Sequence, residues 1–131
     1  MALSAEERIK VCGRVAGEKK ATDSILLDLR ELSTITDYFL ICSGQSQRQV
    51  KTIADAIDEV LSQSGVQPVG REGYEEGRWV LLDYDEFIVH IFQPEVRKFY
   101  DLERLWGVTV QHWAEPAGTF VAAPQRRPAN L

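Results

Sequence analysis

The sequence of 131 residues lacks a surplus of basic residues, because 15 Lys and Arg stand against 20 Asp and Glu and give a formal net charge of −5. Proteins that bind nucleic acid through its phosphates need clustered Lys and Arg, which displace condensed counterions. The composition therefore argues against direct binding to RNA or DNA. If the chain acts on a nucleic-acid assembly, we expect it to contact a basic protein there and to make little direct contact with RNA.

Metal ligands and long apolar runs are also scarce. Cys12 and Cys42 stand alone without a CxxC spacing, so no zinc site is expected, and both are interpreted as buried free thiols of a reducing compartment. No apolar run approaches the ~20 residues of a membrane-spanning helix. Residues 1–8 carry Glu6 and Glu7 and no hydrophobic stretch, unlike a secretory or transit peptide. We expect a cytoplasmic protein with no metal, no cofactor and no membrane partner.

The apolar periodicity predicts an α/β fold. Residues 46–64 form the clearest helical pattern, with Ser46 as N-cap and Gly65 at the expected C-terminal position, and Ser4 with Glu7 forms a capping box before an earlier helix. The expected helices span residues 5–20, 46–64 and 94–106, and the expected strands span residues 24–30, 38–42, 66–70, 78–84 and 87–92. The prediction is a single domain whose mixed, roughly five-stranded sheet is flanked by helices and contains a parallel crossover and an antiparallel hairpin.

The composition changes near the end of the chain. Pro116, Pro124 and Pro128 fall among many alanines, and no helical or strand period continues there. Such a segment has too few apolar contacts to offset the entropy of ordering it. We therefore predict an α/β domain over residues 1–107 and a disordered tail rich in Pro and Ala over residues 108–131.

The predicted hairpin has two apolar faces. A two-residue turn at residues 85–86 pairs Tyr84 with Phe87, Leu82 with Val89, and Val80 with Ile91 on one face. The opposite face carries Trp79, Leu81, Asp83, Ile88, His90 and Phe92. Periodicity alone favours helices of the same chain covering this second face, because mixed sheets are usually covered on both sides. The alternative is that its rim near Trp79 binds a partner, since Trp, Tyr and Arg most often dominate interface energies.

An enzymatic alternative rests on Asp83 and Asp85, which spell D-x-D at a strand end. Paired carboxylates of this kind can hold Mg²⁺ for nucleotidyl transfer, given a third carboxylate and a loop that binds phosphate, for which residues 43–46 are the candidate. D-x-D at a hairpin is more often turn chemistry. His90 on an apolar strand face is likewise more often a packing residue than a catalytic base.

Several linked motifs in order resemble the RsfS/Iojap family of ribosomal silencing factors. The matching segments are residues 36–50 (TDYFLICSGQSQRQV), 53–57 (IADAI), 77–84 (GRWVLLDY), 89–92 (VHIF) and 97–106 (RKFYDLERLW). The resemblance implies a nucleotidyltransferase-like fold without catalytic residues. It also implies that the protein binds the large ribosomal subunit through large-subunit ribosomal protein fourteen, sterically blocks association with the small subunit, and represses translation under nutrient limitation.

By motif position, Trp79 is the first choice for a residue that anchors the partner. The other partner-binding candidates are Asp83, His90, Arg97, Tyr100 and Leu81. Ser43, Gly44 and Arg48 also match the family, with roles that are open between binding and structure. A large-subunit assembly factor is an alternative function, since it needs the same contact, and a homodimer of the free protein is left open.

Two positions depart from the family pattern. The family usually has Gly in the hairpin turn where this chain has Asp85, so the D-x-D is interpreted as accidental. The family often continues with an acidic residue where Gly107 and Val108 follow Trp106 here. The Ser43-Gly44 order also differs from the Gly-Ser pair that nucleotidyltransferases typically carry at this place.

Overall fold

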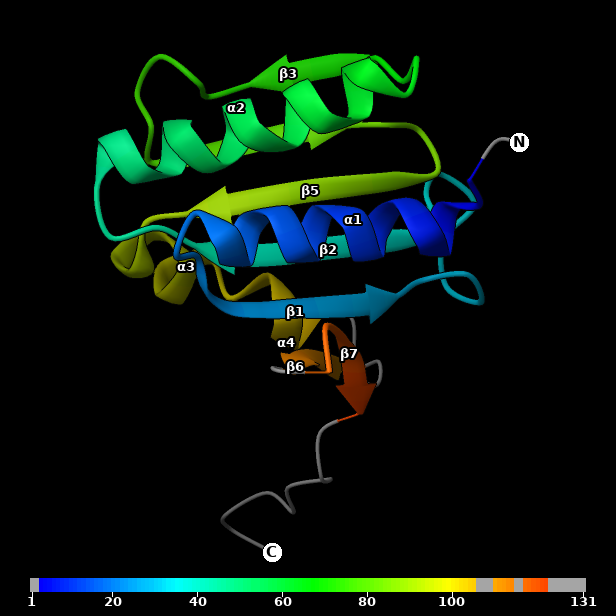
Figure 1. Ribbon diagram of the computed structural model, residues 1–131. Coiled ribbons are helices and arrows are strands. Elements are labelled where there is room, and N and C mark those ends of the chain that lie inside the picture. The colour runs from blue at the N-terminus through cyan, green and yellow to red at the C-terminus, as the bar shows by residue number, and fades with distance from the viewer. Residues whose placement is uncertain (1–2, 106–109, 115–116, 123–131) are drawn as a thin grey trace, which may run out of the picture.

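A computed structural model describes residues 3–105, 110–114 and 117–122 (Figure 1). The strands form one sheet in the order β3-β4-β5-β2-β1-β6-β7. They are β1 (Thr22–Asp28), β2 (Tyr38–Ser43), β3 (Gly70–Glu72), β4 (Trp79–Asp83), β5 (Phe87–Phe92), β6 (Val110–Ala114) and β7 (Thr119–Ala122). The helices are α1 (Ala5–Glu18), α2 (Gln47–Gln63), α3 (Pro94–Tyr100) and α4 (Leu102–Leu105). The mixed α/β fold is confirmed, but within the described residues the sheet has seven strands rather than five.

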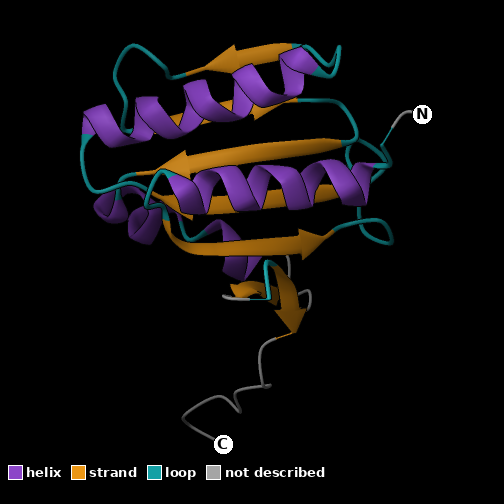
Figure 2. Cartoon of the chain, in the orientation of Figure 1, coloured by secondary structure: helices purple, strands orange, loops and turns teal. Residues whose placement is uncertain are grey.

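The two long helices cover one face of the sheet, and the two short ones lie behind the other face (Figures 1 and 2). The apolar stripe predicted for α2 is buried on the sheet, and Ser46 caps its start by accepting the N–H of Gln49. Gly65 follows the helix with φ +81°, as its position predicted. The capping box of Ser4 and Glu7 at α1 is also confirmed. None of the helices in the described part of the chain is long and apolar enough to cross a membrane.

The predicted crossover is only partly confirmed. β2 does form a parallel pair, but its partner is β5, with Ile41 opposite His90. β3 occupies residues 70–72 rather than 66–70 and pairs antiparallel with β4 at the sheet edge. α2 connects β2 to β3, but the two strands are not neighbours in the sheet. The hairpin of β4 and β5 lies between them.

The hairpin register is confirmed residue by residue. Val80 lies opposite Ile91 and Leu82 opposite Val89, and the N–H of Tyr84 donates to the carbonyl of Phe87. Side chains of this first face pack under α1 and α2, where they join the larger part of the hydrophobic core.

The tail prediction is wrong for β6 and β7, which extend the sheet beyond residue 107. β6 pairs antiparallel with the outer edge of β1, and β7 pairs with β6. The physical reason lies in α1: a Cβ at Gly13 would come within 2.7 Å of the Trp113 ring and 2.9 Å of the Phe120 ring, so both rings pack directly on the helix backbone. Residues 123–131, also predicted to be disordered, lie outside the described part.

The final helix is interrupted, contrary to the prediction of one helix over residues 94–106. Asp101 adopts a left-handed conformation with φ +48° and ends α3, after which α4 begins at Leu102. Val96 and Leu102 pack on the sheet. Phe99 is 80% exposed.

Candidate partner-binding face

The far face is defined as the β4 and β5 side chains opposite α1 and α2: Trp79, Leu81, Asp83, Ile88, His90 and Phe92. Alternation along the paired strands places all six on one side. α3 and α4 cover only part of it. Phe92 is fully buried in the cluster that holds Val96, whereas Trp79, Leu81 and Ile88 remain half-buried. Among the described residues, the chain's own helices therefore cover one section of this face and leave Trp79, Leu81 and Ile88 half-buried. Partner binding by this open part stays a prediction.

Trp79 occupies the centre of an aromatic cluster at one end of the far face. Its ring stacks on Phe92, with centroids 4.8 Å apart and an interplanar angle of 27°. It also contacts the ring of Tyr100 of α3, with centroids again 4.8 Å apart. The indole Nε1–H donates to Nδ1 of His90 over 3.1 Å. The structure thus brings three of the predicted binding residues into contact.

His90 lies deeper in the same cluster and is only 4% exposed. Its ring meets the edge of Phe39 with centroids 4.6 Å apart. Burial lowers the pKa of the imidazole to about 4, so the ring is neutral at neutral pH. Because Nδ1 accepts from Trp79, the neutral ring carries its proton on Nε2, and that atom has no hydrogen-bond partner among the described residues.

Arg97 and Ser43 join α3 to the end of β2. Nη1 of Arg97 donates to the Ser43 hydroxyl over 2.8 Å, and Ser43 is buried. Gly44 is equally constrained, because a Cβ there would lie 3.0 Å from a methyl group and from the backbone nitrogen of Val50. These contacts give Ser43 and Gly44 structural roles. Arg48, in contrast, is exposed on α2, whose helix packs on the other face of the sheet.

The exposed rim of the cluster comes from the end of α3. Tyr100 is 48% exposed, and Phe99 meets its ring edge-on with centroids 5.1 Å apart. Sequence reasoning missed Phe99 as a surface residue. Its direct adjacency to Tyr100 was the available signal, since neighbouring positions of a helix point in different directions.

Asp83 lies at the opposite end of the far face, away from the aromatic cluster. Its Oδ1 accepts the backbone N–H of Asp85 over 2.8 Å, and Asp85 has φ +72°. The D-x-D is thus engaged in the hairpin turn, where Asp85 has a left-handed backbone conformation that glycine adopts most easily. Among the described residues, no three His, Cys, Asp or Glu side chains gather as a metal site would require.

The loop between β2 and α2 is tied to neighbouring parts of the chain by hydrogen bonds of Gly44, Gln45 and Gln49. The N–H of Gly44 donates to the Phe92 carbonyl, and that of Gln45 donates to Oε1 of Gln49. The Gln49 amide in turn donates to the Lys19 and Lys20 carbonyls. Two backbone donors of the loop are therefore already bound within the chain.

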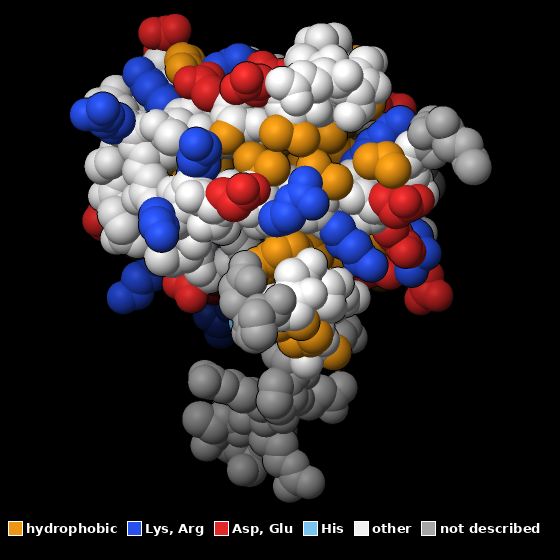
Figure 3. Space-filling view, in the orientation of Figure 1, with side chains coloured by type: hydrophobic (Ala, Val, Ile, Leu, Met, Phe, Trp, Pro, Cys, Tyr) orange, Lys and Arg blue, Asp and Glu red, His pale blue; other side chains and the backbone are white. Residues whose placement is uncertain are grey.

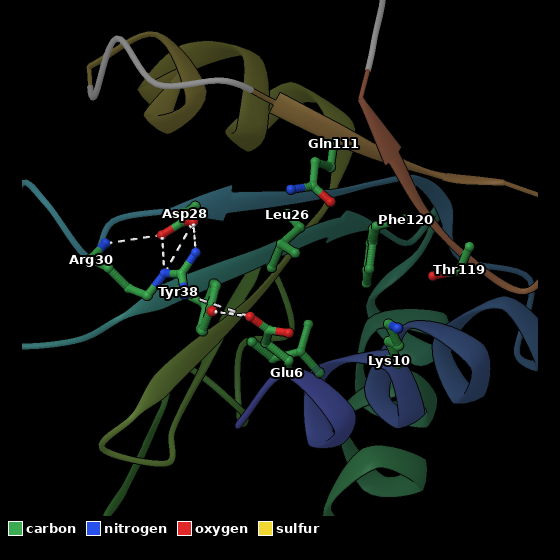
Figure 4. A pocket seen from close by; sticks show the side chains of 10 residues that line it. Glu6, Lys10, Leu26, Asp28, Arg30, Tyr38, Gln111, Thr119 and Phe120 are labelled. Carbon is green, nitrogen blue, oxygen red and sulfur yellow. Dashed lines mark hydrogen bonds and ion pairs between the residues drawn. The ribbon is translucent and has the colours of Figure 1, made fainter. Parts of the chain in front are cut away.

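The opposite side of the molecule holds a hollow of about 220 Å³ between α1, β1 and the β6–β7 hairpin (Figure 4). Three of its charged lining groups are bound within it: Tyr38 donates to Glu6 over 2.9 Å, and Arg30 pairs with Glu6 and Asp28. On that side, hydrophobic side chains gather along the seam between α1 and α2, surrounded by charges of both signs (Figure 3). The aromatic cluster of the far face is the more distinctive surface.

Comparison with known proteins identifies the family to which this chain belongs. A family model described as "ribosomal silencing factor during starvation" matches residues 2–129. The chain belongs to the RsfS family.

Individual members agree with this assignment. The RsfS of Bacillus subtilis is 40% identical over 99 residues, which are 76% of this chain and 84% of that protein. A crystal structure of a Chromobacterium violaceum protein superposes with a TM-score of 0.78 at 37% identity and covers 81% of this chain and 88% of that one. A mouse protein named for mitochondrial assembly of the ribosomal large subunit is 27% identical over 92 residues, 68% of this chain and 40% of that protein. The resemblance in the sequence is confirmed.

Proposed function

We propose that the protein binds the large ribosomal subunit through large-subunit ribosomal protein fourteen and thereby prevents the small subunit from joining. Translation would then be repressed when nutrients are limiting. The mechanism is steric: a folded domain docked on the joining surface excludes the other subunit without chemistry. In this proposal the protein acts in the cytoplasm, needs no cofactor and has no enzymatic activity.

The observation that carries the proposal is the aromatic cluster at the open end of the far face. Trp79 is half-buried and Tyr100 is 48% exposed, so both present ring surface that a partner can cover. Large aromatic side chains of this kind are enriched among the residues that dominate binding energy. The net charge of −5 favours a basic protein as the partner over RNA.

A role in assembling the large subunit is the second candidate. It is favoured by the name of the mouse relative, which refers to assembly of the mitochondrial ribosomal large subunit. Both roles use a contact with the large subunit. They differ in timing, because a silencing factor inhibits mature subunits whereas an assembly factor acts on precursors.

The test is co-sedimentation of the purified protein with separated large and small subunits, followed by a subunit-joining assay. We expect binding to the large subunit alone and loss of joined ribosomes. Trp79→Ala should weaken binding by about 2 kcal/mol or more, a change of roughly 30-fold, because it removes the centre of the aromatic cluster. The oligomeric state of the free protein is measured in parallel, since self-association through the same face would compete with the ribosome.

The matched control is Tyr74→Ala. This aromatic ring lies on the α2 side, where it contacts Arg71 and Asp55, and its loss should leave binding unchanged. Equal affinity of Trp79→Ala and the wild type, with intact circular dichroism, would remove Trp79 from the interface. Binding to precursor particles without inhibition of joining would favour the assembly role.

A further inference from the structure

We propose that His90 is a positioning residue for partner binding, which holds the indole ring of Trp79 in the orientation presented at the open rim. The inference rests on the proposed function in one respect, namely that Trp79 anchors the partner. In this proposal His90 acts by orienting Trp79 and does not itself contact the partner.

The geometry of the strand pair makes this action possible. Trp79 lies opposite Phe92 and His90 lies opposite Leu81, so the two residues are diagonal neighbours on the far face. At this separation long side chains of adjacent strands can meet. The indole Nε1–H donates to Nδ1 of His90 over 3.1 Å, and the two ring centroids are 5.9 Å apart. This hydrogen bond fixes the direction of the indole edge and so selects one rotamer of Trp79.

The selected rotamer is the one that brings the indole of Trp79 against Tyr100 at the exposed rim. With its N–H directed at His90, the indole stacks on Phe92 and also contacts Tyr100. His90 is itself held in place by the edge contact with Phe39. A side chain already fixed in its binding orientation loses less conformational entropy when a partner docks.

Packing alone does not explain why a histidine occupies this buried position. His90 is 4% exposed among apolar side chains, yet its Nε2 atom has no hydrogen-bond partner among the described residues. A buried polar atom without a partner destabilises a fold, and an apolar side chain of similar size would avoid that penalty. Only a residue with a hydrogen-bond acceptor at this position can accept the indole N–H of Trp79.

The experiment compares His90→Leu, which removes the acceptor, with His90→Asn, whose Oδ1 takes the place of Nδ1. The indole N–H signal of Trp79 is followed by NMR in the free protein and is assigned by its loss in Trp79→Phe. We expect His90→Leu to fold with an equal or higher thermal midpoint, to expose the indole N–H to exchange with water, and to bind large subunits up to about tenfold more weakly. His90→Asn should keep the protected N–H and most of the affinity.

A structural role would give a different pattern. In a Trp79→Phe background, which has no indole N–H, His90→Leu should have no further effect on binding. Further weakening there would overturn the positioning role, as would an unchanged indole signal and affinity in His90→Leu. If His90→Leu does not fold, His90→Phe provides the same comparison.

Failure of the two proposals can be told apart. If Trp79→Ala weakens binding and His90→Leu does not, the positioning role is wrong and the proposed function stands. If the wild-type protein does not bind large subunits, both are wrong, whatever the indole signal shows.

Discussion

Acidification should destabilise the folded protein through His90. In the unfolded chain the imidazole takes up a proton near its ordinary pKa of 6.5, whereas burial lowers the pKa in the folded protein to about 4. Between these values the unfolded state binds the proton and the folded state does not. Stability that is fully present above pH 6.5 is therefore lost as the pH falls towards 4.

The two pKa values determine the size of the effect. With 6.5 for the unfolded chain and about 4 for the folded one, the free energy of unfolding should fall by about 2 kcal/mol between pH 7 and pH 5. Urea denaturation followed by tryptophan fluorescence at both pH values measures this change. The same titration on His90→Asn removes the contribution of the buried imidazole, because the amide does not take up a proton in this range.

The comparison of variants separates His90 from the carboxylates, which titrate equally in both proteins. We expect the pH-dependent loss in His90→Asn to be smaller than in the wild type by about 2 kcal/mol. His112→Asn, at an exposed position on β6, should keep the full loss. An identical loss in the wild type and His90→Asn would refute the reasoning, since it would mean that His90 takes up its proton equally well in the folded state.

Three further predictions concern the packing of the β6–β7 hairpin on α1, the turn at Asp85, and nucleotide binding at Asp83. Gly13→Val should destabilise the fold by about 1–3 kcal/mol in urea denaturation, because its side chain displaces Trp113 and Phe120; no change would contradict their packing on α1. Asp85→Val should lose about 1–3 kcal/mol at φ +72°, whereas Asp85→Gly should lose none, and equal stability of the two variants would contradict the strained turn. Mg²⁺ with ATP should leave the thermal midpoint unchanged; a stabilisation abolished by Asp83→Asn would revive the nucleotidyltransferase alternative.

Local patterns were enough to predict α2 and the hairpin. The stripe of α2 follows from its spacing, and a two-residue turn at residues 85–86 fixes the register that places Leu82 opposite Val89. The strands β6 and β7 were missed because their stability depends on contacts far along the chain. Trp113 meets the backbone at Gly13, and no local period in the sequence indicates such a contact. The break at Asp101 was missed for a related reason, since its left-handed backbone interrupts an apolar period that continues through Leu102.

In the candidate site too, local patterns predict some features, and others depend on contacts that the sequence does not reveal. Alternation along β4 and β5 predicts that Trp79 and His90 lie on one face, and this placement is confirmed. The sequence did not reveal that the two side chains form a hydrogen bond, because a diagonal contact depends on side-chain rotamers as well as on register. It also did not separate Arg97, which binds Ser43 within the chain, from Tyr100, which is exposed at the rim.

The pairing of β6 with β1 has a consequence for how the chain folds. Ile25 lies opposite His112, so one edge of the sheet closes only after nearly the whole domain has been synthesised. Pairings between distant segments form slowly, because a long loop must be closed before they contribute stability. Until Val110 arrives, the outer backbone groups of β1 remain unpaired and offer a template for strands of other chains. A nascent or truncated chain that ends before β6 is therefore expected to be prone to aggregation along this edge.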